Sequence, residues 1–213
     1  MDSRLTFAEH VDAAISKANR MLGLLMRSMQ VSTRTHRIRF DHHAALVAYK
    51  AHVRSVMEYG SVIWSGAAVT HLRRFERLQH RFLMWLGSRT QASCPSLDYV
   101  SLLELFNCAS VRSRLTQSDL TFARSVLSGR LDCADIVGMF PLSVPGRRTR
   151  RPELFHVPRE SGRVDSVRRG FIVRLPQLLN TLMRDKPQAD LFQPSPALRS
   201  DIATFANDQG TYL

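Results

Sequence analysis

Residues 69–86 read VTHLRRFERLQHRFLMWL, and the pattern in this stretch constrains the rest of the chain. Its large side chains recur every three or four positions, the spacing of one face of an α-helix. This inner row consists of Leu72, Phe75, Gln79, Phe82 and Leu86. An outer row consists of Arg74, Arg77 and Arg81. Gly87 is typical of a helix C-terminus, so the stretch predicts one helix whose inner face must be covered by other elements.

Residues 6–29 predict a second helix of the same kind. Thr6 and Glu9 have the spacing of a capping box, in which each side chain bonds the backbone N–H of the other residue. The apolar row that follows is Phe7, Val11, Ala14, Ala18, Leu22, Leu25 and Met29. Three cations lie off this row and are expected on the surface: Lys17, Arg20 and Arg27.

Residues 41–64 predict the remaining helix of this group. Asp41 is a suitable N-cap, Gly60 weakens the last turn, and Gly66 ends the helix. The apolar row is Ala45, Leu46, Tyr49, Val53, Val56, Met57 and Ile63. No helix of this length buries its apolar face alone, so we expect an antiparallel three-helix bundle over residues 1–89.

The second half of the chain predicts shorter and less regular elements. Helices are expected over 96–106, 108–127, 132–140 and 170–183 (the last interrupted near Pro176), with an extended segment over 154–157. Beyond Pro187 there is little periodicity. The chain therefore predicts a mainly α fold in three parts. These are the bundle at 1–89, a connecting helical segment at 90–140, and a partly irregular region at 141–213 that is rich in proline and arginine and holds the Arg147–Arg151 cluster.

The charge of the chain points to a polyanionic partner. Its 213 residues include 30 Lys and Arg against 18 Asp and Glu, a net charge of +12, and only Lys17, Lys50 and Lys186 are lysine. Arginine binds phosphate through two parallel hydrogen bonds and stacks on bases, so nucleic acid is the default interpretation. The alternative is an arginine-rich composition with merely solvated helix faces. The aromatic residues Trp64, Phe75, Phe82 and Trp85 lie on or beside apolar rows, which favours core packing over base stacking.

Catalytic and metal-binding patterns are not found in the sequence. It contains no glycine-rich phosphate loop, no Asp-Asp pair, and no motif that places a base beside a nucleophile. His42 and His43 diverge by about 100° on a helix and do not readily share an ion with His36. We therefore expect no catalytic residue, no metal and no cofactor, and no enzymatic activity from this chain by itself.

The compartment is predicted from what the sequence lacks. Cys94, Cys108 and Cys133 are an odd number at wide spacing, which gives neither a disulfide framework nor a zinc site. No apolar run reaches the roughly 18 residues of a membrane span, and the first residues do not resemble a signal peptide. An intracellular location, nucleus or cytoplasm, is expected, without membrane association.

Three ordered blocks stand out along the chain: LTFAEHV with KANRMLG at 5–23, VRSVMEYGSVIW at 53–64, and FERLQHRFL at 75–83. They resemble the segment that follows the palm in non-LTR (LINE-type, jockey-like) retrotransposon reverse transcriptases. Shorter matches continue to about residue 192 in the order of the family.

The resemblance implies a polymerase thumb and the region beyond it. In that family the catalytic aspartates lie in a palm upstream, so the chain is expected to be a non-catalytic fragment that works with a palm and fingers segment. A thumb holds the template–primer duplex through backbone contacts that do not depend on sequence. From the periodicity we expect the nucleic-acid-binding residues to be Lys17, Arg20, Arg27, Arg74, Arg77 and Arg81. A helical protein-interaction module and a non-functional retroelement remnant are the alternatives.

Overall fold

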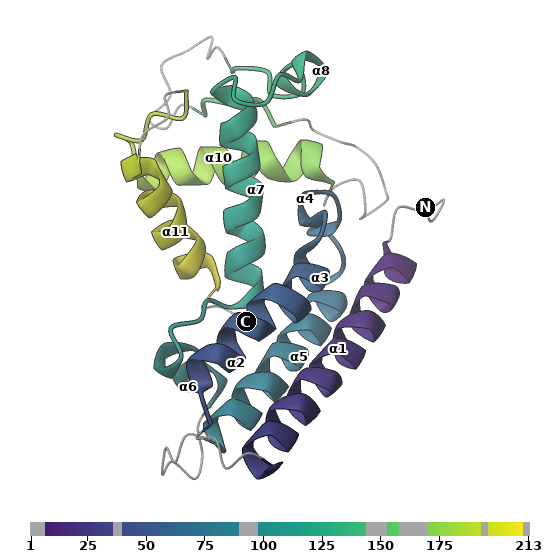
Figure 1. The fold of residues 1–213 in the computed structure, drawn as a ribbon. Coiled ribbons are helices and arrows are strands. Elements are labelled where there is room, and N and C mark those ends of the chain that lie inside the picture. The colour runs from purple at the N-terminus through teal and green to yellow at the C-terminus, as the bar shows by residue number, and fades with distance from the viewer. Residues whose placement is uncertain are drawn as a thin grey trace. The chain divides into compact units, whose positions relative to one another are not determined.

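The computed structural model describes residues 7–35, 40–89, 98–143, 153–157, 170–192 and 196–210. These residues are mainly helical, which confirms the predicted fold class (Figure 1). The chain divides into two compact units. Unit 1 comprises Met1–Tyr59 and Ala68–Val111, and unit 2 comprises Gly60–Ala67 and Arg112–Leu213. These units cut across the predicted division at residues 89 and 140, and the independent folding of the three predicted parts stays a prediction.

Unit 1 is built on three helices that lie side by side (Figure 1). The first is α1 (Ala8–Thr35), which runs past the predicted end at residue 29. The second position holds a composite helix of α2 (His42–Ala48), the π-helical η1 (Tyr49–Arg54) and α3 (Ser55–Glu58). The third is α5 (Val69–Gly87), followed by the short α6 (Tyr99–Leu105). The predicted capping residue Thr6 lies outside the described residues.

The composite helix departs from the single predicted helix over 41–64. Asp41 caps it as expected, its carboxylate accepting from the backbone N–H groups of His43 at 2.9 Å and Ala44 at 3.2 Å. It ends at Glu58, because the cap residue Tyr59 has an extended ψ of 125° and Gly60 adopts a left-handed backbone with φ of 62°. Residues 61–64 form the separate α4 (Ser61–Trp64), which belongs to unit 2.

The core of unit 1 lies between the apolar rows predicted from the sequence. Val11 and Leu22 of α1, Val53 of η1, and Phe75 and Phe82 of α5 are all buried. Gly87, predicted to lie just beyond the end of α5, is the last helical residue, and Ser88 is the C-cap. An added Cβ at Gly87 would lie 3.4 Å from the Leu102 side chain of α6, which is an ordinary van der Waals contact.

Unit 2 has its own hydrophobic core, formed mainly by three long helices. These are α7 (Val111–Leu127), α10 (Phe171–Asp185) and α11 (Pro196–Gly210), with the short α8 (Ala134–Val137) beyond α7. Phe155 lies in this core and forms an antiparallel bridge with Leu142, so the predicted extended segment at 154–157 is confirmed. Asn180 holds the Phe155 backbone, accepting from its N–H at 2.9 Å and donating to its carbonyl at 2.8 Å.

Two predictions for the C-terminal region are wrong. Pro176 does not interrupt α10; it lies buried inside a continuous helix whose other buried side chains include Leu175 and Leu179. The residues beyond Pro187 are not uniformly aperiodic, because α11 buries Leu198, Ile202, Phe205 and Ala206 at helical spacing. The Arg147–Arg151 cluster lies outside the described residues. Within the ranges that are described, no helix has the length and apolar character needed to cross a membrane.

Alanine substitutions at Gly60 and Gly23 should change the free energy of unfolding in opposite directions. Neither has an atom within 4 Å of an added Cβ, but only Gly60 has a positive φ. We expect Gly60→Ala to lower the free energy of unfolding by about 1 kcal/mol, because the left-handed backbone is strained for alanine. Gly23→Ala, inside α1, should raise it by about 0.5–1 kcal/mol. Urea denaturation of both variants measures these changes, and a stabilising Gly60→Ala would contradict the assigned turn.

Candidate nucleic-acid interface

The predicted cationic residues lie on two neighbouring helices of unit 1. Lys17, Arg20 and Arg27 are exposed on α1, and Arg77 and Arg81 are exposed on α5. α1 and α5 pack against each other along the bundle (Figure 1). The structure therefore brings both predicted rows onto one unit.

Arg74 marks where α1 and α5 meet. Its side chain forms an ion pair with Asp12 of α1, and 39% of the Arg74 side chain remains exposed. Both residues lie in the first half of their helices, so α1 and α5 run in the same direction. Because Asp12 already compensates its charge, Arg74 offers less net positive charge to an anion than its neighbours.

The position of Asp12 shows how the cations of α1 are turned relative to α5. On a regular helix, Arg20 and Arg27 are turned from Asp12 by about 80° and about 60°, and the buried Ile15 and Leu22 are turned by about 60° and about 80° in the opposite sense. Asp12 therefore borders the seam, by which we mean the outer surface between α1 and α5, and Arg20 and Arg27 lie on the outer face of α1. Lys17, turned by about 140°, lies further still from the α5 cations.

The α5 arginine row, defined here as Arg73, Arg77 and Arg81, is the most regular basic feature of the described surface. All three residues are exposed and recur every four positions, about 6 Å apart along the helix axis. Arg73 is missing from the predicted set, although its four-residue spacing from Arg77 would have identified it. The single acidic residue of α5 is Glu76, which lies off this row and accepts a hydrogen bond from the Tyr99 hydroxyl of unit 1.

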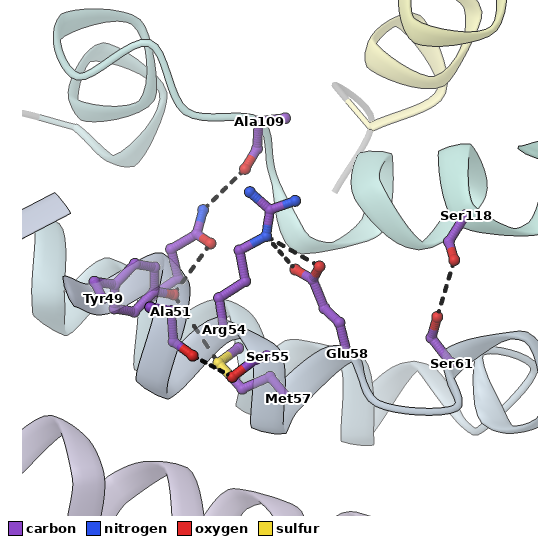
Figure 2. A network of polar contacts seen from close by, with 10 residues as sticks. Tyr49, Ala51, Arg54, Ser55, Met57, Glu58, Ser61, Ala109 and Ser118 are labelled. Carbon is purple, nitrogen blue, oxygen red and sulfur yellow. Dashed lines mark hydrogen bonds and ion pairs between the residues drawn. The ribbon is translucent and has the colours of Figure 1, made fainter. Parts of the chain in front are cut away.

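A buried amide fixes the direction in which this row faces. Gln79 is 1% exposed, and its side-chain N–H groups donate to the Tyr99 hydroxyl at 3.1 Å and the Ala109 carbonyl at 3.0 Å. The Tyr49 hydroxyl lies 3.4 Å from the Gln79 carbonyl oxygen and donates to it (Figure 2). The Tyr49 ring stacks on Phe82 with centroids 4.1 Å apart. These contacts hold the inner face of α5 in the core and leave the arginine row outside.

Arg54 illustrates a cation whose charge is compensated locally. Its guanidinium Nε lies 3.0 Å from the Glu58 carboxylate, one turn further along the composite helix (Figure 2). The two side chains are 35% and 21% exposed. Such a pair adds no net charge, so this helix contributes less to an anion-binding surface than α5.

Unit 2 contains a buried charged cluster that the sequence analysis did not identify. Asp119 of α7 is 2% exposed and accepts from Arg174 Nε of α10 at 2.9 Å and from the Ser65 hydroxyl at 3.0 Å. Arg174 also donates to the Val62 carbonyl at 2.8 Å, and Ser61 donates to the Ser118 hydroxyl at 3.3 Å (Figure 2). The cluster fastens residues 60–67 to α7 and α10.

We interpret this cluster as structural, because its contacts hold residues 60–67 against α7 and α10. Burial raises the pKa of Asp119 from 3.8 to about 6, while Arg174 and Ser65 act in the opposite direction. The Asp119 carboxylate oxygens accept hydrogen bonds from the Arg174 guanidinium and the Ser65 hydroxyl. Among the contacts described for this cluster there is no histidine base, which nucleophilic chemistry at a serine needs. Among residues with described positions, no group of three His, Cys, Asp or Glu side chains could hold a metal ion.

No family model, no curated protein and no solved structure matches this chain. The resemblance to reverse transcriptases stays a prediction. A function for the chain must therefore be argued from its own geometry and charge, of which the exposed α5 arginine row is the clearest feature.

The raised pKa of Asp119 predicts a pH-dependent stability. Between pH 3.8 and about 6, folded Asp119 holds a proton that the unfolded chain has released, so the free energy of unfolding falls as pH rises through this window. The expected decrease is on the order of 2–3 kcal/mol. Asp119→Asn removes the titrating group, so its stability relative to wild type should increase from pH 4 to pH 6.5. Denaturation at several pH values measures this difference, and a constant or decreasing difference would contradict the assignment.

Proposed function

We propose that this chain binds nucleic-acid duplexes without regard to sequence, through the α5 arginine row and the adjoining cations of α1. The observation that carries the proposal is the exposed, four-residue repeat of Arg73, Arg77 and Arg81, with no acid on the same row. Guanidinium groups bind phosphate through paired hydrogen bonds, and the condensed counterions they displace drive association.

The arrangement of two helices favours a duplex over a single strand as the main ligand. Arg20 and Arg27 lie on the outer face of α1, and the arginine row lies on the outer face of α5. Packed helices have axes about 8–10 Å apart, so neighbouring helices of unit 1 present two cationic rows instead of one. An A-like RNA–DNA hybrid offers two phosphate rows on either side of a shallow minor groove, which suits such a surface.

Within this proposal the chain acts as the thumb of a non-LTR retrotransposon reverse transcriptase. It holds the template–primer hybrid, while a palm and fingers segment supplies the carboxylates and metal ions of phosphoryl transfer. The chain itself performs no chemical step. What supports this role is the three-helix bundle of unit 1 together with the ordered sequence blocks on α1, on the composite helix and its continuation to Trp64, and on α5.

A second candidate function is a protein-interaction module, and one observation favours it. The short α8 has no buried residue, and the segment around it exposes four apolar side chains: Leu131, Val137, Met139 and Leu142. A contiguous exposed apolar segment is typical of a protein-binding surface. A folded oligomer that has no affinity for nucleic acid would favour this function over duplex binding.

Salt dependence should reveal the contribution of the arginine row. Converting Arg73, Arg77 and Arg81 together to glutamine should weaken binding of an RNA–DNA hybrid and reduce the slope of log K against log salt by about 2 to 3. Fluorescence anisotropy of a labelled hybrid over a salt series measures both quantities. Hybrids of unrelated sequence should give the same values, because the contacts are to the backbone.

A matched variant controls for net charge in this experiment. Arg130, Arg184 and Arg199 are exposed arginines of unit 2, and their joint conversion to glutamine removes the same total charge. It should leave the slope close to that of wild type. Equal losses in the two triple variants would show that binding follows overall charge, and an absence of salt-dependent binding in wild type would exclude the proposed function.

Removal of Asp12 should strengthen binding. Asp12→Asn deletes a negative charge at the seam and releases Arg74 from its ion pair. The affinity for hybrid at low salt should rise a few-fold, about what one exposed ion pair is worth. Glu9→Gln, which removes an exposed acid of α1 with no described ion pair, is the control for charge alone. Weaker binding of Asp12→Asn would place Arg74 outside the interface.

A further inference from the structure

The arginine row continues into an aromatic side chain at the C-terminal end of α5. Residues 73, 77, 81, 85 and 89 are spaced by four and read Arg, Arg, Arg, Trp, Arg. Positions four residues apart form one ridge on a helix surface, and Arg89 follows in the turn directly after α5. One ridge therefore carries three cations, an indole and a further cation.

Trp85 is held in place from its inner side. The Phe40 ring packs against it edge-on at a centroid distance of 5.5 Å, and the Phe82 ring lies 6.1 Å away, tilted by 31°. Phe82 itself is fully buried. These contacts account for the core packing that the sequence predicts for Trp85, and they fix the orientation of its ring.

Part of the Trp85 side chain is exposed. Trp85 is half-buried, in contrast to Trp64, which is 2% exposed. The guanidinium carbon of Arg89, an exposed residue, lies 6.0 Å from the centre of the Trp85 ring. A solvent-exposed cation reaches the ring, so a planar ligand can reach it from the same side.

The electrostatics of this end favour a neutral ring over a phosphate beside the indole. The C-terminus of a helix carries a partial negative charge, which disfavours anions near the last turn. Aromatic side chains beside cationic tracks are the usual stacking sites for unpaired bases, because every base has a π-face. Arg89 then remains available to the adjoining phosphate.

We propose that Trp85 stacks an unpaired nucleobase that extends from the duplex held by the α5 arginine row, with Arg89 binding the phosphate of that nucleotide. This inference rests on the proposed function and adds a ligand class to it, a hybrid with a single-stranded extension. The duplex contacts lie along the arginine row, and the unpaired nucleotide lies at its end.

The test compares a blunt RNA–DNA hybrid with the same hybrid carrying a short single-stranded extension. Wild-type protein should bind the extended hybrid about tenfold more tightly than the blunt one, within the range of aromatic stacking on a base. The extended hybrid should also quench tryptophan emission, and the blunt hybrid should not. In Trp85→Phe only Trp64 emits, and its emission should not change on binding, because Trp64 is buried.

Two variants separate stacking from folding. Trp85→Leu keeps an apolar side chain against Phe40 and Phe82 but lacks the π-face, so it should lose most of the preference for the extended hybrid and keep the blunt affinity of wild type. Arg89→Gln changes only an exposed residue and should lose part of the preference, even if Trp85→Leu proves unstable.

The experiment distinguishes failure of the stacking site from failure of duplex binding. Equal binding of blunt and extended hybrids by wild type, or an undiminished preference in Trp85→Leu, would overturn the stacking site and leave duplex binding intact. No binding of either hybrid would overturn both proposals. Quenching by the extension that persists in Trp85→Phe would assign the signal to Trp64 and also overturn the stacking site.

Discussion

The buried amide of Gln79 determines how α5 is turned about its own axis. An amide in an apolar core is costly unless its donor and acceptor groups are both bonded, and here Tyr49 supplies the donor while Tyr99 and the Ala109 backbone accept. Rotating α5 by one residue would separate the amide from these groups and carry the arginine row toward the core. The inner polar contact and the outer basic surface are therefore consequences of the same helix orientation.

The arginines of this chain fall into two physical classes. Those on the outer face of α5 are exposed and offer their charge to solvent, whereas Arg114 and Arg124 of α7 are 7% and 5% exposed and belong to the interior of unit 2. Arg174 is similarly committed, through its bonds to Asp119 and the Val62 carbonyl. A net charge of +12 therefore overstates the charge available to a ligand. What distinguishes a binding surface is the arrangement of uncompensated cations, which composition does not contain.

Much of unit 1 is predictable from the sequence, because each of its long helices has an apolar face with clear periodicity, although the pattern predicts only a weakened last turn where the helix breaks before Gly60. Unit 2 is less predictable. The helix α11 is only weakly amphipathic and depends on packing against the rest of its core. The carboxylate of Asp119 binds Ser65 and Arg174, which lie 54 and 55 residues away in the sequence, so no local sequence pattern predicts these contacts. The predicted cations of α1 and α5 are found on the surface. Their distance from the seam is not predictable from the sequence, because the Asp12–Arg74 ion pair is needed to identify the side of α1 that faces α5.

The assignment of Gly60–Ala67 to unit 2, although both flanking segments belong to unit 1, makes the two units interleaved in the chain. The polypeptide passes from one unit to the other three times, after Tyr59, after Ala67 and after Val111. No single cut yields either unit whole, so expression of residues 1–89 alone would leave the buried Ser65 without its partner Asp119. During synthesis, α4 leaves the ribosome long before α10 exists. Its final packing must therefore wait for Arg174, which donates a hydrogen bond to the Val62 carbonyl of α4.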